Sequence, residues 1–324
     1  MATRTTLLDV ARAAGVSKST ASRVLSGVDR NVDAELAERV LQAGERLGYR
    51  VNAVARALRR QTTGSFGVLV PSIRNPYFVH LVDAFSQVAS RSGMGVILAD
   101  SLDDPDVEAE RLEMLRDSFV DGIVVVPTSM TRSGPAIRQA AERTRVVQVD
   151  RWATGAGCGF VGVDNAAGVA ALVAHLRAAG RTRIRYVGAE QEASASAERL
   201  AAFRELAGPG DAEMLLPHFS TTAGRDAAHV LLAAPELPDA VLCAADVLAV
   251  GLLSTLQRRG VRVPRDVAVT AFDGTDLLEL VDPPITALHH RLDAIAARAV
   301  DMLTGPASTE ETRIRAELVV RAST

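Results

Sequence analysis

The chain has 324 residues, enough for two or three compact units, and its 48% hydrophobic and 23% charged residues are an ordinary composition for a soluble protein. Its formal net charge of −3 argues against a surface that binds nucleic acid throughout. The charge is unevenly distributed, however. Residues 1–60 hold 11 Lys and Arg against 6 Asp and Glu, whereas residues 61–324 hold 25 against 33. A basic N-terminal segment on an acidic body predicts that only the first sixty residues meet phosphate.

The two cysteines, Cys158 and Cys243, offer neither a disulfide framework nor metal-ligand spacing, and both are expected to be buried thiols. The N-terminus lacks the apolar core of a signal peptide, and no run of ~18 apolar residues occurs. We therefore expect a cytoplasmic protein without a metal or another cofactor.

Residues 7–25 predict two short helices joined by a tight turn. Thr6 can cap the first helix, with Asp9 three residues later as its capping-box partner. Gly15 supplies the residue that can take a positive φ in the turn, and Ser17 can cap the second helix. The inward face of the first helix is apolar and consists of Leu7, Val10, Ala11 and Ala14. This is the helix-turn-helix pattern, whose second helix enters the major groove.

A third amphipathic helix is predicted over residues 33–47, with Asp33 as its N-cap. Its apolar stripe consists of Leu36, Val40, Ala43 and Leu47. Residues 52–60 also favour a helix, but a helix of two turns rarely forms alone in water and needs a partner or a ligand. Residues 61–65 (QTTGS) indicate a flexible joint.

From Phe66 onward, short apolar runs alternate with amphipathic segments. The apolar runs are residues 66–70, 95–99, 122–126, 146–149, 183–187, 240–245 and 267–272, and the helices predicted between them include 77–91, 108–118, 165–179 and 245–259. This alternation predicts an α/β fold with parallel sheets buried on both faces. Because the strands fall into two groups with a crossover near residues 162–164, we expect two doubly wound subdomains with a ligand cleft between them.

Several stretches resemble one known family. TLLDVARAAGVSKSTASRVLSG and VDAELAERVLQAGERLGYRVNAVARALRR are similar to the headpiece and hinge of the lactose-repressor/galactose-repressor (LacI/GalR) family. The resemblance continues in the family's order through GVLVPSIRNPYF, VGVDNAAG, ERLAAF, AADVLAVGLL, GVRVPRDVAVTAFDG and PPITALHH. It implies a homodimeric transcription regulator, usually a repressor, that binds a palindromic operator. It also implies a small effector, most often a sugar, between two periplasmic-binding-protein-like subdomains.

The resemblance places a helix-turn-helix headpiece at residues 1–50, a hinge helix and linker at 51–62, and an effector-binding and dimerisation core at 63–324. Within the core, the N-subdomain is expected at about 63–162 and 291–306, and the C-subdomain at about 163–290 and 307–324. No heptad helix follows the last strand-like segment, residues 314–320, so a dimer is expected rather than a tetramer.

On the second helix, Lys18, Ser19 and Arg23 are expected to point outward. Arginine can pair with a guanine edge, while lysine and serine can reach bases or phosphates; the alternative is a solvated helix face. In the family, the positions that match Lys18 and Ser19 vary with the operator. Contacts to the DNA backbone are expected from polar residues for which helix capping alone is an equal alternative: Thr6, Ser17, Ser22 and Asn52.

Leu58 lies on the short basic helix without a core to join, and a helix in the minor groove can insert an apolar side chain between base steps. The resemblance places Leu58 at the family's intercalating leucine, with Ala55 packing the paired hinge helices and Arg59 as a further DNA contact. The alternative is that Leu58 packs on the core. The family often has proline where Val51 stands, so this hinge is less stiffened in advance.

The resemblance also places Arg199, Asp246 and Asp273 at polar positions that face the family's effector, where charged groups can hold hydroxyls. The alternative for Asp246 is a helix cap. The loop after the first strand can add an amide and aromatic rings, from Asn75, Tyr77 and Phe78, although the two aromatic residues can also be core residues. Weaker candidates are Arg151, Trp152 and Phe219. Asp164 and Asn165 are expected to cap the following helix.

Small residues at 193–197, and Ala202 and Ala271 in place of family glycines, indicate an altered pocket floor, so the effector is not identified. His289 and His290 have no neighbouring ligand cluster, and ordinary polar roles in a segment between subdomains are expected. No phosphate loop or catalytic set stands out, so no enzyme is predicted. Two alternatives use the same core fold: a solute-binding protein for transport and a sugar- or nucleotide-processing enzyme. The headpiece favours the regulator over both.

Overall fold

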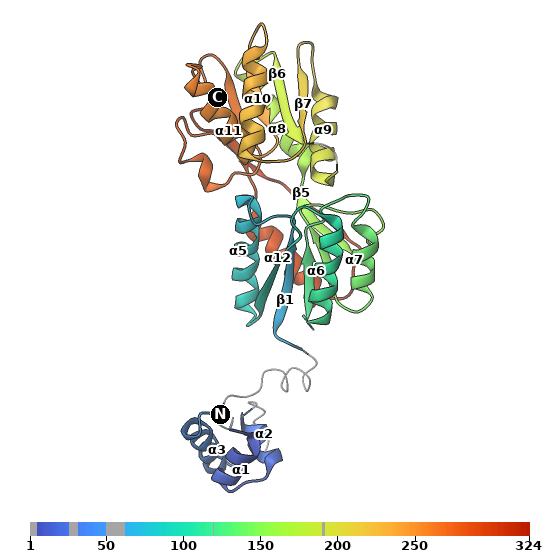
Figure 1. Ribbon diagram of the computed structural model, residues 1–324, viewed down its shortest axis with the longest axis vertical. Helices are drawn as coiled ribbons and strands as arrows, with labels where there is room; N and C mark the ends of the chain where they lie inside the picture. Colours follow the sequence, from blue (N-terminus) through green and yellow to red (C-terminus); the bar gives the residue numbers. More distant parts are fainter. Residues whose placement is uncertain (1–4, 26–31, 50–61, 119, 190–191) are drawn as a thin grey trace. The chain divides into compact units, whose positions relative to one another are not determined.

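The computed structural model describes residues 5–25, 32–49, 62–118, 120–189 and 192–324, and Figure 1 shows its elements. The chain divides into two compact units, Met1–Gly64 and Ser65–Thr324. Within the described ranges, none of the helices has the length and apolar character that a membrane span requires.

The described residues of the N-terminal unit form three helices, α1 (Leu7–Ala14), α2 (Lys18–Leu25) and α3 (Ala34–Arg46). The capping box predicted at Thr6 is present: the Thr6 side chain accepts from the Asp9 backbone, and the Asp9 side chain accepts from the Thr6 backbone. Gly15 takes a φ of 67° in the turn. The predicted caps at Ser17 and Asp33 are confirmed as well, since Ser17 Oγ accepts from the Thr20 amide at 3.1 Å and Asp33 accepts from two amides of α3.

A small apolar core holds these three helices together. It consists of Val10, Ala11, Ala14, Ala21, Val24, Val40 and Ala43, and Leu47 and Tyr49 pack against its edge. The guanidinium of Arg39 donates to the Ala14 carbonyl at 2.6 Å, which ties the end of α1 to α3. Alanine occupies most of the buried positions, so the helices approach closely and little apolar area is buried.

In the second unit, two six-stranded sheets form two lobes. The N-lobe sheet has the order β11-β5-β4-β3-β1-β2 and is entirely parallel. Its strands are β1 (Ser65–Val70), β2 (Gly95–Asp100), β3 (Gly122–Val125), β4 (Val146–Val149), β5 (Gly159–Val163) and β11 (Glu311–Ile314). One face is covered by α5 (Pro76–Arg91) and α12 (Leu292–Thr304), and the other by α6 (Pro105–Asp117) and α7 (Gly134–Ala141).

The C-lobe sheet has the order β12-β10-β9-β8-β6-β7; among its described strand pairs, β10–β12 is antiparallel and the others are parallel. Its strands are β6 (Ile184–Ala189), β7 (Ala212–Leu216), β8 (Ala240–Cys243), β9 (Ala268–Ala271), β10 (Thr286–His289) and β12 (Glu317–Val319). Helices α8 (Asn165–Ala178) and α9 (Ser194–Leu206) pack on one face, and α10 (Thr221–Ala233) and α11 (Asp246–Arg258) on the other; a 3-10 turn spans Asp276–Leu278.

Along the described residues, the chain passes between the lobes three times: after β5, between β10 and α12, and between β11 and β12. The first two passages lie where the sequence predicts them. The expectation that residues 307–324 all belong to the C-subdomain is wrong, because β11 pairs with β5 of the N-lobe and the third passage falls at residues 315–316. Residues 314–320 resemble a single strand in sequence, and their apolar pattern does not reveal which sheet edge each half joins.

The predicted α/β alternation is confirmed, with helix ends within a few residues of those expected and α6 beginning earlier, at Pro105, with Asp104 as its cap. Strands β5, β7 and β10 lie outside the apolar runs from which the sequence predicts strands. Cys243 is buried in β8, as predicted, whereas Cys158 is only partly buried. Burial raises the pKa of the Cys158 thiol to about 12, which keeps it protonated at neutral pH.

Helices α10 and α11 cross at backbone contact distance, and two glycines make this possible. A Cβ atom on Gly251 would lie 2.1 Å from the Thr221 carbonyl oxygen, and one on Gly224 would lie 2.2 Å from that of Leu248. Neither oxygen can move away without shifting its helix.

Replacing Gly251 with alanine is therefore expected to lower the free energy of unfolding by about 1–3 kcal/mol, the usual range for an overpacked core, despite alanine's better helix propensity. The measurement is urea unfolding of the full chain. Gly208→Ala is the control, because a Cβ atom there would have the end of the Arg177 side chain as its nearest heavy atom, at 3.4 Å. This substitution should change the free energy of unfolding little. An unchanged stability of the Gly251 variant would contradict the close crossing.

Candidate functional site

In the N-terminal unit, α2 presents a polar face. Lys18, Ser19 and Arg23 are exposed, whereas Ala21 and Val24 of the same helix are buried in the core. The Ser19 hydroxyl lies 2.7 Å from that of Ser17, so the helix cap and the exposed face are linked. The side chains that the sequence predicts to read DNA thus point into solvent from one helix.

Other predicted DNA contacts are placed differently. Thr6 and Ser17 are exposed and their hydroxyls serve as caps, and Ser22 is partly buried. Asn52, Ala55, Leu58 and Arg59, the predicted hinge contacts, lie outside the described residues. Their roles stay predictions.

A cleft lies between the two lobes of the second unit, at the carboxyl ends of the strands. Its lining comes from the segments after β1, β4, β7, β8 and β9 and from α9, and consists of Asn75, Tyr77, Phe78, Asp150, Arg151, Ala195, Arg199, Phe219, Ala245 and Asp273. The cavity that they enclose has a volume of about 20 Å³, which is room for about one water molecule. A larger ligand therefore requires the lobes or the side chains to move.

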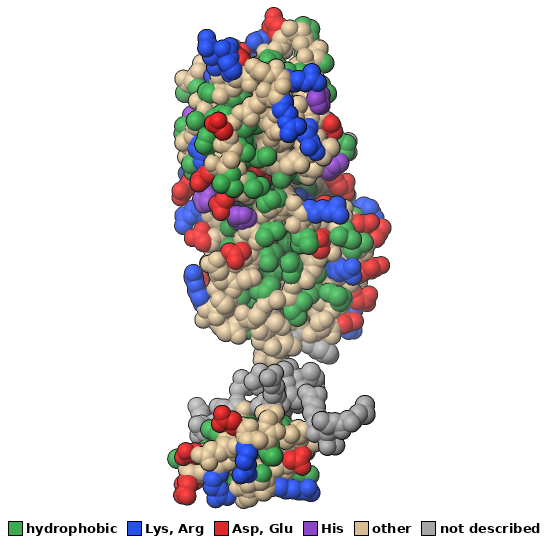
Figure 2. Space-filling model, turned by 60° about the vertical axis from the view of Figure 1, so that its left-hand side comes forward, with side chains coloured by type: hydrophobic (Ala, Val, Ile, Leu, Met, Phe, Trp, Pro, Cys, Tyr) green, Lys and Arg blue, Asp and Glu red, His purple; other side chains and the backbone are tan. Residues whose placement is uncertain are grey.

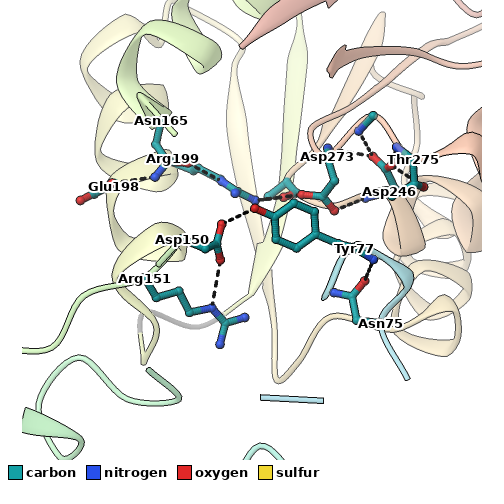
Figure 3. Close-up of polar contacts among 12 residues, drawn as sticks. Asn75, Tyr77, Asp150, Arg151, Asn165, Glu198, Arg199, Asp246, Asp273 and Thr275 are labelled. Carbon is teal, nitrogen blue, oxygen red and sulfur yellow. Dashed lines mark hydrogen bonds and ion pairs between the residues drawn. The ribbon is translucent and has the colours of Figure 1, made fainter. Parts of the chain in front are cut away.

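Arg199 of α9 is the central charge of the cleft and is only 4% exposed. Its Nε donates to Asn165 Oδ1 at 2.8 Å, and its Nη1 donates to the Ala244 carbonyl at 2.6 Å and lies 3.5 Å from Asp273 Oδ1. The guanidinium also lies over the ring of Phe272, 3.9 Å from the ring centroid. Figure 3 shows Asn165 and Asp273 beside Arg199.

Asp273 is held in place by Asp246, the first residue of α11. Asp246 Oδ1 accepts from the amides of Asp273 and Gly274, and its Oδ2 accepts from the amide and the hydroxyl of Thr275. In return, the Asp246 amide donates to Asp273 Oδ2 at 3.1 Å. Burial and the nearby charge of Asp246 raise the pKa of Asp273, so this carboxyl group can act as a hydrogen-bond donor more readily than an ordinary aspartate.

On the N-lobe side, the Tyr77 hydroxyl donates to Asp150 Oδ1 at 2.7 Å. Asp150 takes a φ of 63°, and its other oxygen lies 3.8 Å from Nε of Arg151. The Arg151 guanidinium is in turn 5.2 Å from the ring centroid of Phe78. Burial and the charge of Asp150 raise the pKa of Tyr77, so its hydroxyl keeps its proton and acts as a donor.

His290 lies where the chain passes between β10 and α12, and it is 2% exposed. Its ring meets those of Tyr77 and Phe272 edge-on, at centroid distances of 5.4 and 5.5 Å. Burial, together with the positive charge of Arg199, lowers the pKa of His290 well below its ordinary value. This imidazole is therefore neutral at physiological pH and packs as an aromatic residue between the lobes.

The architecture of both units matches known proteins. Residues 6–52 match the family described as bacterial regulatory proteins of the lacI family, and residues 173–324 match a periplasmic binding protein-like domain. The chain is 32% identical to the transcriptional regulator MalR of Streptomyces coelicolor over 99% of this chain and 96% of that protein. The chain belongs to the lacI family of bacterial regulatory proteins.

Other relatives agree with this assignment. The transcriptional repressor PurR of Mannheimia succiniciproducens is 29% identical over 98% of both chains. The lac repressor dimer bound to operator and the anti-inducer ONPF has the same fold, with a TM-score of 0.89 over 99% of both chains at 23% identity. A complex of the regulator CelR with cellobiose has a TM-score of 0.70 at 27% identity, covering 99% of this chain and 100% of that one. These relatives are transcriptional regulators, so the transport and enzyme alternatives are not favoured.

Within this lacI-family chain, the structure brings most of the predicted effector residues together: seven of the eight line the cleft, and they are Asn75, Tyr77, Phe78, Arg151, Arg199, Phe219 and Asp273. Asp246 does not line the cleft. It does not cap α11 either, because its carboxylate is taken up by the backbone of residues 273–275. Trp152 is not among the lining residues either, and its Nε1 donates to Glu198.

Sequence reasoning missed two lining residues, Asp150 and Ala245, whereas Ala195 belongs to the segment 193–197 that it assigned to the pocket floor. Asp150 directly follows β4, so its position at the carboxyl end of a strand is a signal that could have found it. The cap predicted at Asp164 is confirmed, since Asp164 accepts from the Ala167 amide at 3.0 Å. Asn165, expected as a second cap, instead joins Arg199 to Glu198.

The buried His290 makes stability depend on pH. Its pKa is lowered in the folded protein, whereas in the unfolded chain it is near 6.5. The unfolded state therefore binds more protons in acid, and stability present above about pH 6.5 is lost as the pH falls. We expect His290 to contribute a loss of about 1.4 kcal/mol by about pH 5.5.

Urea unfolding at neutral pH and at about pH 5.5 measures this loss. His290→Phe should reduce the difference between the two conditions, whereas His289→Gln, at the exposed neighbouring position, should leave it as in the unmodified chain. An equal pH dependence in all three proteins would contradict the burial of a neutral imidazole.

Proposed function

We propose that this lacI-family regulator binds a palindromic operator as a homodimer and acts as a repressor whose operator affinity is set by a small hydroxyl-rich effector in the cleft. The observation that carries the proposal is a cleft lined from both lobes, on the same chain as a helix-turn-helix unit with an exposed polar face. Such a regulator acts where the DNA is, in the cytoplasm, and carries out no chemical reaction.

The lining chemistry supports a hydroxyl-rich ligand. A hydroxyl group donates to one partner and accepts from another, and the cleft offers the carboxylates of Asp150 and Asp273 together with the guanidinium of Arg199. The rings of Tyr77 and Phe78 offer flat apolar faces, which suit the C–H faces of a sugar. The CelR complex contains cellobiose, which agrees with a sugar as the effector here.

The lobes give such a ligand a way to act. Because the lining comes from both lobes, a ligand that contacts both binds one arrangement of the lobes more tightly than another, and it shifts the population toward that arrangement. The corresponding change in operator affinity is typically about 5- to 150-fold, or ~1–3 kcal/mol.

Exposed apolar side chains on the N-lobe support a homodimer. The strand β2 is at the edge of its sheet, and Ile97 and Leu98 on it are 38% and 46% exposed. Exposed Ile73, Val79 and Leu102 belong to the same lobe, and Figure 2 shows hydrophobic side chains gathered on one of its faces. Large exposed apolar patches mark interaction sites, and a symmetric dimer requires an operator with matching symmetry.

Selection of duplexes from a random library is expected to enrich a palindrome with half-sites about one helical turn, ~10 bp, apart. Arg23→Ala should weaken binding to that palindrome by about 5- to 150-fold, the effect of losing one bidentate base contact. Arg46→Ala is the matched control, because it removes the same charge from an exposed position of α3. Equal losses in the two variants, or no enriched palindrome, would contradict the proposal.

A thermal-shift screen against sugars, polyols and nucleobases tests the effector. A sugar at 100 times its Kd should stabilise the full chain by about 2.7 kcal/mol. Arg199→Gln should abolish this shift, whereas Arg204→Gln, at an exposed position of the same helix, should keep it. Stabilisation that persists unchanged in the Arg199 variant would place the ligand elsewhere.

A further inference from the structure

Glu198 immediately precedes Arg199 on α9, and its side chain lies outside the cleft lining. Its carboxylate accepts four hydrogen bonds: two from Arg313, at 2.7 and 2.8 Å, one from Trp152 Nε1 at 2.7 Å, and one from Asn165 Nδ2 at 2.6 Å. A guanidinium that donates two parallel N–H bonds to one carboxylate makes a strong, charge-assisted pair. Each of the two carboxylate oxygens of Glu198 therefore accepts two hydrogen bonds.

The partners of Glu198 come from both lobes. Arg313 lies in β11 and Trp152 follows β4, both in the N-lobe, whereas Glu198 and Asn165 belong to α9 and α8 of the C-lobe. Arg313 is also held by the ring of Phe160 in β5, at 4.7 Å from the centroid, and the Trp152 amide donates to Ser194 Oγ of α9 at 2.8 Å. This group of contacts holds the lobes together beside the cleft.

Asn165 connects this group to the cleft. Its amide nitrogen donates to Glu198, and its amide oxygen accepts from Nε of Arg199 at 2.8 Å. Since the two ends of an amide differ, the bond to Glu198 decides that the oxygen is the end that faces Arg199. Figure 3 shows Asn165 close to both side chains.

We propose that Glu198 is a positioning residue that orients Arg199 through Asn165 and thereby couples the effector site to the contact between the lobes. The proposal rests on the proposed function and adds the route of coupling. When the lobes separate, the contacts of Glu198 with Arg313 and Trp152 break. Glu198 stays beside Asn165 in the same lobe, but its carboxylate is no longer held in the position from which it orients Asn165. Conversely, a ligand that keeps Arg199 in its place favours the joined state of the lobes, as thermodynamic linkage requires.

The ionisation of Glu198 agrees with this role. Although burial raises its pKa, the hydrogen bonds from Arg313, Trp152 and Asn165 outweigh burial and hold the pKa of Glu198 below its ordinary value. The carboxylate is thus charged at neutral pH, and the pair with Arg313 is a full ion pair.

Trp152 is the only tryptophan in the chain, so its fluorescence reports this contact without any ligand. In the full-length protein, Glu198→Gln should shift the emission to longer wavelength and increase quenching by acrylamide. The carboxamide keeps only one acceptor oxygen for the donors of Arg313, Trp152 and Asn165, so the contact with the indole loosens and the ring gains access to water. Glu205→Gln, at an exposed position on the same helix, is the matched control and should leave both signals unchanged. Arg313→Lys keeps the charge but not the two-armed geometry, and it should give an intermediate change.

The coupling is tested from the cleft side. Arg199→Gln and Asn165→Ala should shift the Trp152 emission in the same direction as Glu198→Gln, although neither residue bonds to the indole. The shifts in urea midpoint should also be non-additive when Glu198→Gln and Arg199→Gln are combined, and additive for Glu205→Gln with Arg199→Gln. Circular dichroism of each variant checks that the fold is retained. If Asn165→Ala does not fold, Asn165→Asp takes its place.

Two results would overturn the proposal. If Glu198→Gln and Glu205→Gln have the same emission and quenching, Glu198 does not hold the indole. If Glu198→Gln shifts the emission but the changes at Arg199 and Asn165 do not, the contact exists but is not coupled to the cleft. Neither measurement uses DNA or an effector. A failure of the proposed coupling is therefore distinguishable from a failure to find an operator or a ligand.

Discussion

The arrangement of the cleft depends on one buried charge, the guanidinium of Arg199. A buried charge without partners is strongly destabilising, and removing one partner of such a pair typically costs about 3–5 kcal/mol. Arg199 is satisfied by groups from three separate places in the C-lobe: the Asn165 amide, the Ala244 carbonyl and the Asp273 carboxyl. The loops at the carboxyl ends of β8 and β9 are thus held around this side chain.

The residues that line the cleft were predictable from the sequence where they sit directly after strands or match a family motif, as Asn75, Arg199 and Asp273 do. Asp246 shows the limit of this reasoning. Its sequence context, at the start of a helix after an apolar strand, is equally suited to a ligand contact and to a cap. The structure gives it a third role, because the amides of residues 273–275 are within its reach. This role of Asp246 depends on the contact between two loops whose residues are 27 positions apart in the sequence. No local sequence pattern indicates that contact.

The fold shows the same division between local and distant information. The caps at Thr6, Ser17 and Asp33 and the alternation of strands and helices follow from short-range patterns, and the structure confirms them. The placement of β11 does not follow, because an edge strand of four residues pairs with whichever edge the chain brings near it. Likewise, nothing in the sequence around Glu198 indicates that Arg313, 115 residues away, supplies its partner.

A cleft whose polar groups already satisfy one another sets a demanding condition for a ligand. In the closed arrangement, the Tyr77 hydroxyl, Asp150, Arg199 and Asp273 have partners within the protein, so a ligand gains affinity only by exchanging these bonds for better ones. A polar group left unpaired after the exchange costs about 1–3 kcal/mol. A ligand that lacks even one matching hydroxyl is therefore strongly disfavoured. The same exchange acts on Arg199, which Asn165 links to the contacts of Glu198 with the N-lobe. Selectivity for the effector and its influence on the lobes then arise from one set of hydrogen bonds.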